Sequence, residues 1–365
     1  MKEGWIKAKL EDICEVNYGT RVVQKIDGGT IYPVYGGGGA TFRMDKYNRE
    51  DCLIVSRFAM SSLCVRFVKG KFFLNDSGLT IESKCNNIKQ DFLDKHILAL
   101  NDKIYSLGKG VAQKNLDIKE LKQLVLCYPS SITEQEIIVA ELDCLSGVIE
   151  KQKQQLKELD NLAQAIFYDM FGDPDNSKYP KIPLCLLSKS KLSYGSGASA
   201  VEYDNNIRYI RITDIQEDGK LNNSPMSPSI YDEKYLLNDG DILFARSGAT
   251  VGKTYLYTQG EGTAIYAGYL IRFVPNKEIV LPEYVFYFTR SEYYKAFIEK
   301  NAQAVAQPNI NAKQYGDLMV CVPPLSLQQE FASKIEAIEK QKELIKQSLS
   351  ETETLFNSRM DYYFN

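Results

Sequence analysis

Apolar residues recur at alternating intervals of four and three positions in two long stretches of the chain, which predicts helices with one narrow apolar stripe. In the first stretch the stripe comprises Ile138, Leu142, Leu145, Ile149, Gln152, Leu156, Leu159, Ala163, Ile166 and Met170, with Gln152 as a polar interruption. In the second stretch it comprises Phe331, Ile335, Ile338, Lys342, Ile345, Leu349, Thr352 and Phe356. Stripes of this spacing are typical of a coiled-coil seam, so we expect each helix to pack against another helix.

Signals for a helix start precede both stretches. Thr133 followed by Glu136, and Ser326 followed by Gln329, match the capping box, which satisfies free amide groups in the first turn of a helix. Gly172 then ends the first stretch, since glycine is the residue that most often terminates a helix.

The expected helices cover residues 131–173 and 325–365 and are each roughly 58 Å long, at ~1.5 Å per residue. Two surface helices, each packed on its own domain, would be a simpler arrangement, but such narrow stripes favour a helical partner. Each helix is the obvious partner of the other. Chain order then predicts an antiparallel pair with one globular domain at each end and pseudo-two-fold symmetry.

A short polar phrase is repeated before the two helices. It reads VAQKNLD at 111–117 and VAQPNIN at 305–311, 194 positions apart. The match continues into CYP at 127–129 and CVP at 321–323 and then into the helices themselves. An internal repeat of this length indicates two copies of one structural unit.

The two remaining segments, 1–130 and 174–324, have the pattern of mixed α+β domains. Short runs rich in β-branched and aromatic residues, such as CLIVSRF, DILFARS and AGYLIRFVP, are separated by Gly, Asn and Asp and predict strands. Helices are expected near DKHILALNDKI and PEYVFYFTRSEYYKAFIEKN. The segments open with VNYGTRV and LSYGSGA, so the repeat extends faintly into them. The predicted fold class is therefore α+β, with two globular mixed α/β domains separated by two long antiparallel coiled-coil helices.

The distribution of charge along the chain indicates where a partner could bind. The chain is 44% hydrophobic and 25% charged and has no run of 18 apolar residues, so each half can form a core and no membrane span is predicted. The net charge of −3 is unevenly distributed, because residues 1–114 carry 18 Lys and Arg against 13 Asp and Glu. Residues 115–172 carry 5 against 10. A basic first domain beside an acidic helix is compatible with a local DNA-binding face.

Cysteine and histidine give no sign of a metal site. The eight cysteines are scattered without a CxxC pair, so we expect small buried hydrophobic residues in a reducing cytoplasm. His96 is the one histidine and is expected to be a packed residue. The N-terminal stretch lacks the apolar core of a signal peptide, and a cytoplasmic location is expected.

Two glycine-containing motifs resemble nucleotide sites but lack the required context. SGATVGKT at 247–254 departs from the P-loop at its first position, and a strand pattern follows it where a helix should begin. We expect a turn between two strands there. YGGGG at 35–39 is expected to be a mobile loop. The sequence contains no NPP[YF] tetrapeptide and no catalytic acid, base or nucleophile set that we would defend, so we expect no enzymatic activity and no bound cofactor.

Two degenerate domains that alternate with two related helices resemble the specificity subunit of type I restriction-modification systems. The resemblance rests on the VAQxN phrase before each helix, on YIRITDI and LNDGDILFARSGATVGKT, and on the helix openings EQEIIVAELD and QQEFASKIEAIE. It covers essentially the whole chain and is weakest in residues 24–110.

The resemblance implies a division of labour. Residues 1–130 and 174–324 would be target recognition domains that each read one half of a bipartite, asymmetric site in double-stranded DNA. The helices would set the spacer and bind two methyltransferase subunits, and motor-nuclease subunits would join for cleavage. Those partners would hold S-adenosylmethionine, ATP and Mg²⁺.

Candidate DNA contacts lie at strand ends, in loops and in the repeated phrase. They are Tyr18, Arg21, Arg57, Arg66, Gln113, Asn115, Tyr194, Arg211, Thr213, Asp214, Arg246, Ser247, Lys253, Gln307 and Asn309. Arg, Ser and Thr at such places reach base edges or phosphates, and each could equally be an ordinary surface residue. Gln and Asn side chains also form turns and helix caps, and this is the preferred interpretation for the Gln and Asn residues of the repeated phrase.

Two other functions remain open at this stage. A scaffold protein could use the same helical rod to hold partners together without reading DNA. An autonomous nucleotide-hydrolysing enzyme would rest on the defective P-loop alone. Neighbouring genes with methyltransferase and helicase motifs would distinguish the scaffold from the specificity subunit, and ATP binding by the isolated chain would favour the enzyme.

Overall fold

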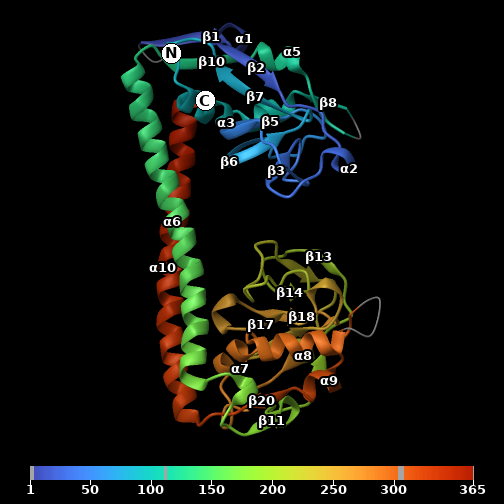
Figure 1. Ribbon diagram of the computed structural model, residues 1–365. Helices are drawn as coiled ribbons and strands as arrows, with labels where there is room; N and C mark the ends of the chain where they lie inside the picture. The colour runs from blue at the N-terminus through green and yellow to red at the C-terminus, as the bar shows by residue number, and fades with distance from the viewer. Residues whose placement is uncertain (1–3, 111–112, 303–307, 365) are drawn as a thin grey trace. The chain divides into compact units, whose positions relative to one another are not determined.

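The computed structural model describes residues 4–110, 113–302 and 308–364 and divides the chain into two compact units. Unit 1 comprises residues 1–153 and 347–365, and unit 2 comprises residues 154–346. Each unit contains a globular part, the start of one long helix and the end of the other (Figure 1). Within the described part of the chain, no helix is long and apolar enough to cross a membrane.

The globular part of unit 1 is built on a six-stranded sheet with the order β2-β7-β5-β6-β3-β4. The strands are β2 Cys14–Tyr18, β3 Tyr32–Tyr35, β4 Arg43–Met44, β5 Arg49–Ser56, β6 Val65–Leu74 and β7 Gly78–Ser83. All neighbouring strands are antiparallel except β3 and β6. The longest of these strands is β6, with ten residues.

Smaller elements complete unit 1. Two short sheets pair β1 Trp5–Lys9 with β10 Val125–Pro129 and β8 Gly108–Lys109 with β9 Asn115–Leu116. The helices are α1 Leu10–Ile13, α2 Gln24–Asp27, α3 Gln90–Ala99, α4 Asn101–Ser106 and α5 Ile118–Lys122. The helix predicted near DKHILALNDKI therefore forms as two helices, α3 and α4, of which α3 packs against β6 and β7.

Unit 2 has a smaller, four-stranded antiparallel sheet with the order β12-β19-β16-β17. These strands are β12 Ser193–Tyr194, β16 Ile242–Ala245, β17 Thr254–Leu256 and β19 Leu270–Phe273. Three two-stranded sheets join β11 Lys181–Pro183 to β20 Met319–Cys321, β13 Ala200–Glu202 to β15 Met226–Pro228, and β14 Arg208–Ile210 to β18 Ala264–Tyr266. The helices are α7 Pro282–Phe288, α8 Glu292–Ala302 and α9 Ala312–Gly316, with short 3-10 turns between the strands.

The repeat predicted from sequence is visible as equivalent pairings in the two units. β1 pairs with β10 in unit 1 as β11 pairs with β20 in unit 2, with Lys7 opposite Cys127 and Lys181 opposite Cys321. The amide of Leu10 donates to the carbonyl of Leu124 at 2.8 Å. The same bond, also 2.8 Å, joins Leu184 to Leu318 in unit 2. The two units therefore share a framework around the junction with the long helices.

The two long helices, α6 Ile132–Phe171 and α10 Leu325–Phe364, each contain 40 residues. Every position of the two predicted stripes is buried or half-buried. Within unit 1 the side chain of Gln152 donates to Ser348 at 2.9 Å, and Arg359 binds Glu141, so the helices run antiparallel there.

In unit 2 the same direction holds. Lys342 lies 2.6 Å from Asp160, and the rings of Phe171 and Phe331 are 5.2 Å apart. Lys342 is 2% exposed and also contacts Glu339 at 2.6 Å, which places a charged group inside the apolar seam.

The predicted capping boxes were wrong. Helix α6 begins at Ile132, so Thr133 lies inside the first turn, and the Oγ of Ser131 accepts the amide of Glu134 at 3.4 Å instead. Helix α10 begins at Leu325, so Ser326 also lies within the helix. The predicted stop was right, because Gly172 has a φ of +75° and its amide donates to the carbonyl of Tyr168.

The cysteines are all free thiols, but they are not all buried. Cys14, Cys64 and Cys321 are buried, whereas Cys144 and Cys185 are exposed. Cys52, Cys85 and Cys127 are half-buried, so the expectation of small buried hydrophobic residues holds fully for three of the eight and fails for the two exposed ones. His96 is packed as expected, 2% exposed, with its ring stacked at 4.8 Å on Phe364.

Candidate nucleic-acid interface

An arginine follows the central strand of the sheet in unit 1 and lies over a tyrosine. Strand β5 ends at Ser56, and the guanidinium of Arg57 lies 4.9 Å from the centre of the Tyr18 ring, within the range of a cation–π contact. Tyr18 ends strand β2 and is 46% exposed. The main chain holds this arginine in place, since the Arg57 carbonyl accepts the amide of Leu116 at 2.8 Å.

The same arrangement occurs in unit 2. Strand β16 ends at Ala245, and the guanidinium of Arg246 lies 4.8 Å from the centre of the Tyr194 ring. Tyr194 ends strand β12 and is 42% exposed. The Arg246 carbonyl accepts the amide of Ile310 at 2.8 Å, so both arginines are tied to the residue that follows the asparagine of the repeated phrase.

A glycine after each tyrosine explains why the dipeptide Tyr-Gly is common to both units. A Cβ on Gly19 would lie 1.9 Å from the carbonyl oxygen of Asn75, and one on Gly195 would lie 2.3 Å from that of Tyr266. No side chain fits such an approach of two main chains. The glycine therefore fixes where the tyrosine strand ends.

The asparagine of the repeated phrase completes each group in a different way. In unit 1 the Oδ1 of Asn115 accepts the amide of Ala59 at 3.3 Å. In unit 2 the Oδ1 of Asn309 accepts Nε of Arg246 at 3.3 Å and Nη2 at 3.2 Å. We call Tyr18, Arg57 and Asn115, and equally Tyr194, Arg246 and Asn309, the Tyr–Arg–Asn cluster of each unit.

The positive charges of Arg57 and Arg246 are not neutralised by an ion pair within the described part of the chain. Among the described residues, no carboxylate forms an ion pair with Arg57 or Arg246. A planar guanidinium that stacks on an aromatic ring still presents hydrogen-bond donors at its edges, in the fork geometry that matches phosphate or a guanine edge. The clusters are therefore suited to an anionic ligand.

Asp214 is not available to DNA, contrary to the sequence-based hypothesis. Its carboxylate is completely buried and accepts the amide of Arg211 at 2.9 Å and the Nη2 of the same arginine at 2.6 Å. This ion pair raises the pKa of the Arg211 guanidinium. Both groups stabilise a turn, and the neighbouring Thr213 is exposed.

Arg66 is also occupied inside its unit. Its Nη1 and Nη2 donate to the carbonyls of Gly38 and Gly37 at 2.5 and 3.0 Å, and burial lowers the pKa of the guanidinium. The hydroxyl of Ser56 donates to the Gly37 carbonyl as well, at 2.8 Å. Arg66 is therefore a support for the glycine run 35–39, which is held by side chains where a free loop was expected.

The other nominated residues lie in several environments. Arg21 and Gln113 are exposed loop residues of unit 1. Ser247 is half-buried and forms an isolated bridge with Asn309, next to the unit 2 cluster. Lys253 is bound to Glu217 at 2.8 Å. Gln307 lies outside the described residues.

The P-loop resemblance is absent from the structure of this segment. Residues 248–250 form a 3-10 turn, and Thr254 begins strand β17, which pairs antiparallel with β16. A turn between two strands was the prediction and is confirmed. No helix N-terminus follows the turn to bind a phosphate chain.

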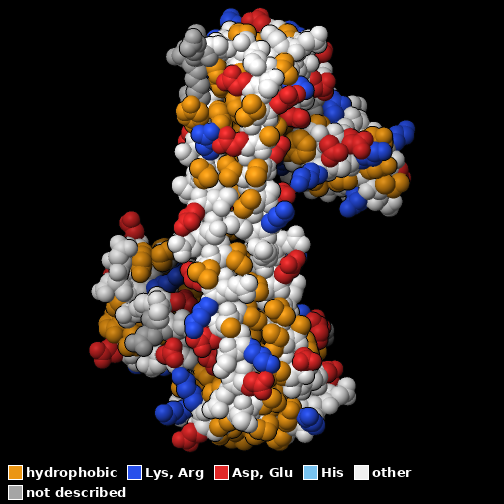
Figure 2. Space-filling model, turned by 90° about the vertical axis from the view of Figure 1, so that its left-hand side faces the viewer, with side chains coloured by type: hydrophobic (Ala, Val, Ile, Leu, Met, Phe, Trp, Pro, Cys, Tyr) orange, Lys and Arg blue, Asp and Glu red, His pale blue; other side chains and the backbone are white. Residues whose placement is uncertain are grey.

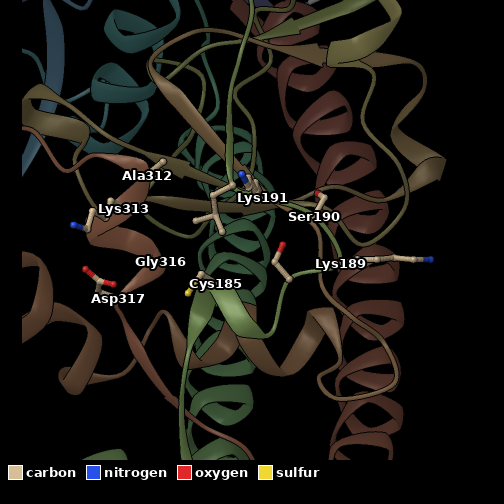
Figure 3. Close-up of a pocket in the computed structure, with 10 residues that line it drawn as sticks. Cys185, Lys189, Ser190, Lys191, Ala312, Lys313, Gly316 and Asp317 are labelled. Atoms are coloured by element: carbon tan, nitrogen blue, oxygen red, sulfur yellow. The ribbon is translucent and has the colours of Figure 1, made fainter.

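A pocket beside the unit 2 cluster was not predicted. It has a volume of about 520 Å³ and is lined by Lys189, Lys191, Lys313 and Asp317, among others. Figure 3 shows Lys191 near the middle of the group, with the side chains of Lys189 and Lys313 extended to opposite sides.

The pocket adjoins the cluster through Ala312. This pocket residue donates its amide to the hydroxyl of Tyr194 at 3.0 Å. The run LSKSKLSYG, which places lysines five and three positions before Tyr194, was the signal in the sequence that could have indicated a basic surface here. Lysines around a surface pocket are suited to the phosphates of a nucleic acid.

Comparison with known proteins gives one family for both units. A family model described as the type I restriction modification DNA specificity domain matches residues 2–161 and 194–354. The type I restriction enzyme MjaVIII specificity subunit of Methanocaldococcus jannaschii is 24% identical over 296 residues, which cover 75% of this chain and 69% of that protein.

Two solved structures share the fold over nearly the whole chain. The S subunit of a type I restriction-modification system from M. genitalium aligns with a TM-score of 0.62 at 17% identity and covers 99% of this chain and 96% of its own. The second is a chain from a structure that describes the assembly and conformational transition of the type I R-M system. It aligns with a TM-score of 0.56 at 13% identity and covers 100% of this chain and 98% of its own.

Proposed function

Because the chain belongs to the family of type I restriction-modification DNA specificity proteins, we propose that it reads a bipartite, asymmetric site in double-stranded DNA, one half through each unit. Members of this family are non-catalytic subunits that recognise a DNA sequence. The observation that carries the proposal is the occurrence of one Tyr–Arg–Asn cluster in each unit. Two similar binding units in one chain suit a site with two separate halves.

In this proposal the long helices set the distance between the half-sites. A helix pair with a continuous seam resists bending and keeps its length, since each added residue contributes ~1.5 Å. The support is that α6 and α10 are uninterrupted over 40 residues each. Each helix starts in one unit and ends in the other.

The helices are also the proposed docking surface for two methyltransferase subunits. Large apolar side chains are exposed on the parts of α6 and α10 that belong to unit 1, namely Ile137 at 62%, Val148 at 39%, Leu355 at 50% and Tyr362 at 58%. Figure 2 shows hydrophobic side chains along the face of these helices. Exposed apolar side chains that gather on one surface are typical of an interface with another protein.

The proposed partners supply the chemistry. The methyltransferase subunits would bind S-adenosylmethionine and methylate adenine, and motor-nuclease subunits would use ATP and Mg²⁺ to cut DNA. This chain would contribute the choice of sequence. In cells that lack this chain, the partner subunits should therefore still be present but should no longer act at a specific DNA sequence.

The test is to map methylated adenines in the host genome with and without the gene for this chain, with the methyltransferase gene present in both strains. We expect one bipartite motif to be methylated only when the chain is present. Methylation of the same motif without the chain would contradict the proposal. A complex that assembles around the chain and methylates without any sequence preference would favour the scaffold alternative.

A further inference from the structure

The two units differ in their sheets and agree in a few polar positions. Unit 1 has a six-stranded sheet and unit 2 a four-stranded one. An arginine over a tyrosine ring nevertheless occurs in both, at 4.9 and 4.8 Å, and in unit 1 Arg57 also lies 4.5 Å from the centre of the Phe58 ring. The bond from the junction amide to the arginine carbonyl is 2.8 Å in each. The shared arrangement therefore persists while the surrounding fold has diverged.

Residues that two reading units share cannot distinguish two different half-sites. In an asymmetric site the bases of the halves differ, whereas the sugar-phosphate backbone is chemically the same in both. Contacts to phosphate fix the register of a protein on DNA and carry no sequence information directly. A shared contact is therefore suited to the backbone, and the segments that differ are suited to the bases.

The geometry of the arginines fits a phosphate contact. Stacking on Tyr18 or Tyr194 restricts the plane of the guanidinium while leaving its edge donors accessible. In unit 2, Asn309 occupies Nε and Nη2 of Arg246, and among the described residues Nη1 has no hydrogen-bond partner. A guanidinium that is held in one orientation before binding loses less conformational entropy when it binds a phosphate oxygen.

We infer that Arg57 and Arg246, each oriented by its stacked tyrosine, bind the DNA backbone in the same way in both half-sites and do not select bases. Tyr18 and Tyr194 are positioning residues in this scheme. The inference rests on the proposed DNA recognition and assigns sequence discrimination to residues that the two units do not share, such as the exposed Arg21 and Thr213.

The test measures binding of the full chain, assembled with its methyltransferase subunits, to the mapped site and to sites with single base changes in either half. Arg57→Ala and Arg246→Ala should each weaken binding roughly tenfold, by the same factor for every sequence. The slope of log affinity against log salt concentration should fall by about 0.9 for each lost phosphate contact. The methylated motif should stay the same.

Matched variants separate charge from folding. Arg57→Gln removes the charge but keeps a planar side chain on Tyr18, and it should show the same loss of salt slope. Tyr18→Phe keeps the ring and should bind as the unchanged protein does, whereas Tyr18→Ala should lose affinity without a change in net charge. All variants should show the thermal unfolding of the parent.

The outcomes are distinct. A variant that accepts a new base at one position of one half-site would show that the arginine reads a base and would overturn the inference while leaving the proposed function intact. Unchanged affinity and salt slope in both alanine variants would also overturn it. If the unchanged complex shows no preference for any sequence, the proposed function itself fails.

Discussion

Gln135 and Gln328 occupy the same place in the two units, inside the first turn of the long helix that begins there. Both are completely buried. The Oε1 of Gln135 accepts the amide of Lys89 at 2.8 Å, and its Nε2 donates to the carbonyls of Asn87 and Pro129 at 2.8 and 2.9 Å. One side chain thus joins the start of α6 to a loop of the globular part.

Gln328 makes the equivalent three bonds in unit 2. Its Oε1 accepts the amide of Leu281 at 2.8 Å, and its Nε2 donates to the carbonyls of Ile279 and Pro323 at 3.2 and 2.8 Å. These bonds hold the start of each helix on its globular part, as the proposed role of the helices in setting the spacer requires.

Replacement of Gln135 by alanine should destabilise the chain by about 2–4 kcal/mol, because the main-chain groups of Asn87, Lys89 and Pro129 lose the partner that this buried side chain supplies. Urea unfolding followed by circular dichroism measures the change. The control is Gln155→Ala, at an exposed position of the same helix, which should change stability by less than about 0.5 kcal/mol. Equal effects of the two substitutions would show that the buried amide does not anchor the helix.

The charged layer at Lys342 leads to a second prediction. Asp160→Asn should destabilise unit 2 by about 1–2 kcal/mol, since it leaves the buried ammonium with Glu339 as its one carboxylate partner among the described residues. Burial and the ammonium of Lys342 already lower the pKa of Lys220 nearby, so positive charge accumulates at this place.

Lys342→Met, in contrast, should leave stability unchanged or increase it. The position belongs to the apolar seam, and both carboxylates are more than 40% exposed and can be hydrated. The two variants are compared by thermal unfolding. A larger loss of stability for Lys342→Met than for Asp160→Asn would contradict this account of the layer.

The buried imidazole of His96 should make the free energy of unfolding depend on pH. Burial lowers the pKa of its imidazole from 6.5 to about 4. As the pH falls from 7 to 4, the unfolded chain binds a proton at this residue that the folded chain does not bind, so stability decreases. The decrease begins near pH 6.5 and amounts to about 3 kcal/mol at pH 4, at ~1.4 kcal/mol per pKa unit.

The measurement compares urea unfolding of the parent and of His96→Phe at pH 7 and pH 4. Burial raises the pKa of Asp94 to about 6, which acts in the opposite direction, but this residue is present in both proteins and its effect cancels. The difference in stability between the two proteins should shift by about 3 kcal/mol in favour of the variant at pH 4. Parallel pH profiles would show that His96 does not contribute.

Lengthening both helices should lengthen the spacer. Gln152 and Ser348 face each other at 2.9 Å, so insertion of seven residues after Gln152 and seven before Ser348 keeps the seam in register. Seven residues add about 10.5 Å, close to three base pairs at ~3.4 Å each. Adenine mapping should show unchanged half-sites separated by about three more base pairs. An unchanged spacer would argue against the helices as a ruler, and insertion in one helix alone is the control that should prevent assembly.

The sequence predicted the long helices well because their signal is a repeated spacing over many turns, and the observed ends lie within two residues of the expected ones. It failed at the caps, where a single hydrogen bond decides between Ser131 and Thr133. All six residues of the two clusters were among the candidate DNA contacts, but the contacts that they make with one another were not predicted. Tyr18 and Arg57 meet because two strands both pair with β7, and no local pattern encodes that register.

Other site residues were misjudged for a similar reason. Asp214 and Arg66 are residue types that commonly contact DNA. The fold buries Asp214 and pairs Arg66 with the carbonyls of Gly37 and Gly38, so the fold decides that both are occupied. The pocket lysines went unnoticed because Lys313 is distant in sequence from Lys189 and Lys191. Long-range contacts of this kind decide which polar residues remain available to a ligand.

The central claim is that each unit reads its own half of the DNA site. Exchange of residues 174–308 for the corresponding segment of a family member with a different target, followed by mapping of methylated adenines, tests it most directly. The account predicts a hybrid motif in which one half and the spacer are unchanged and the other half is that of the donor. A motif changed in both halves, or unchanged in both, would contradict it.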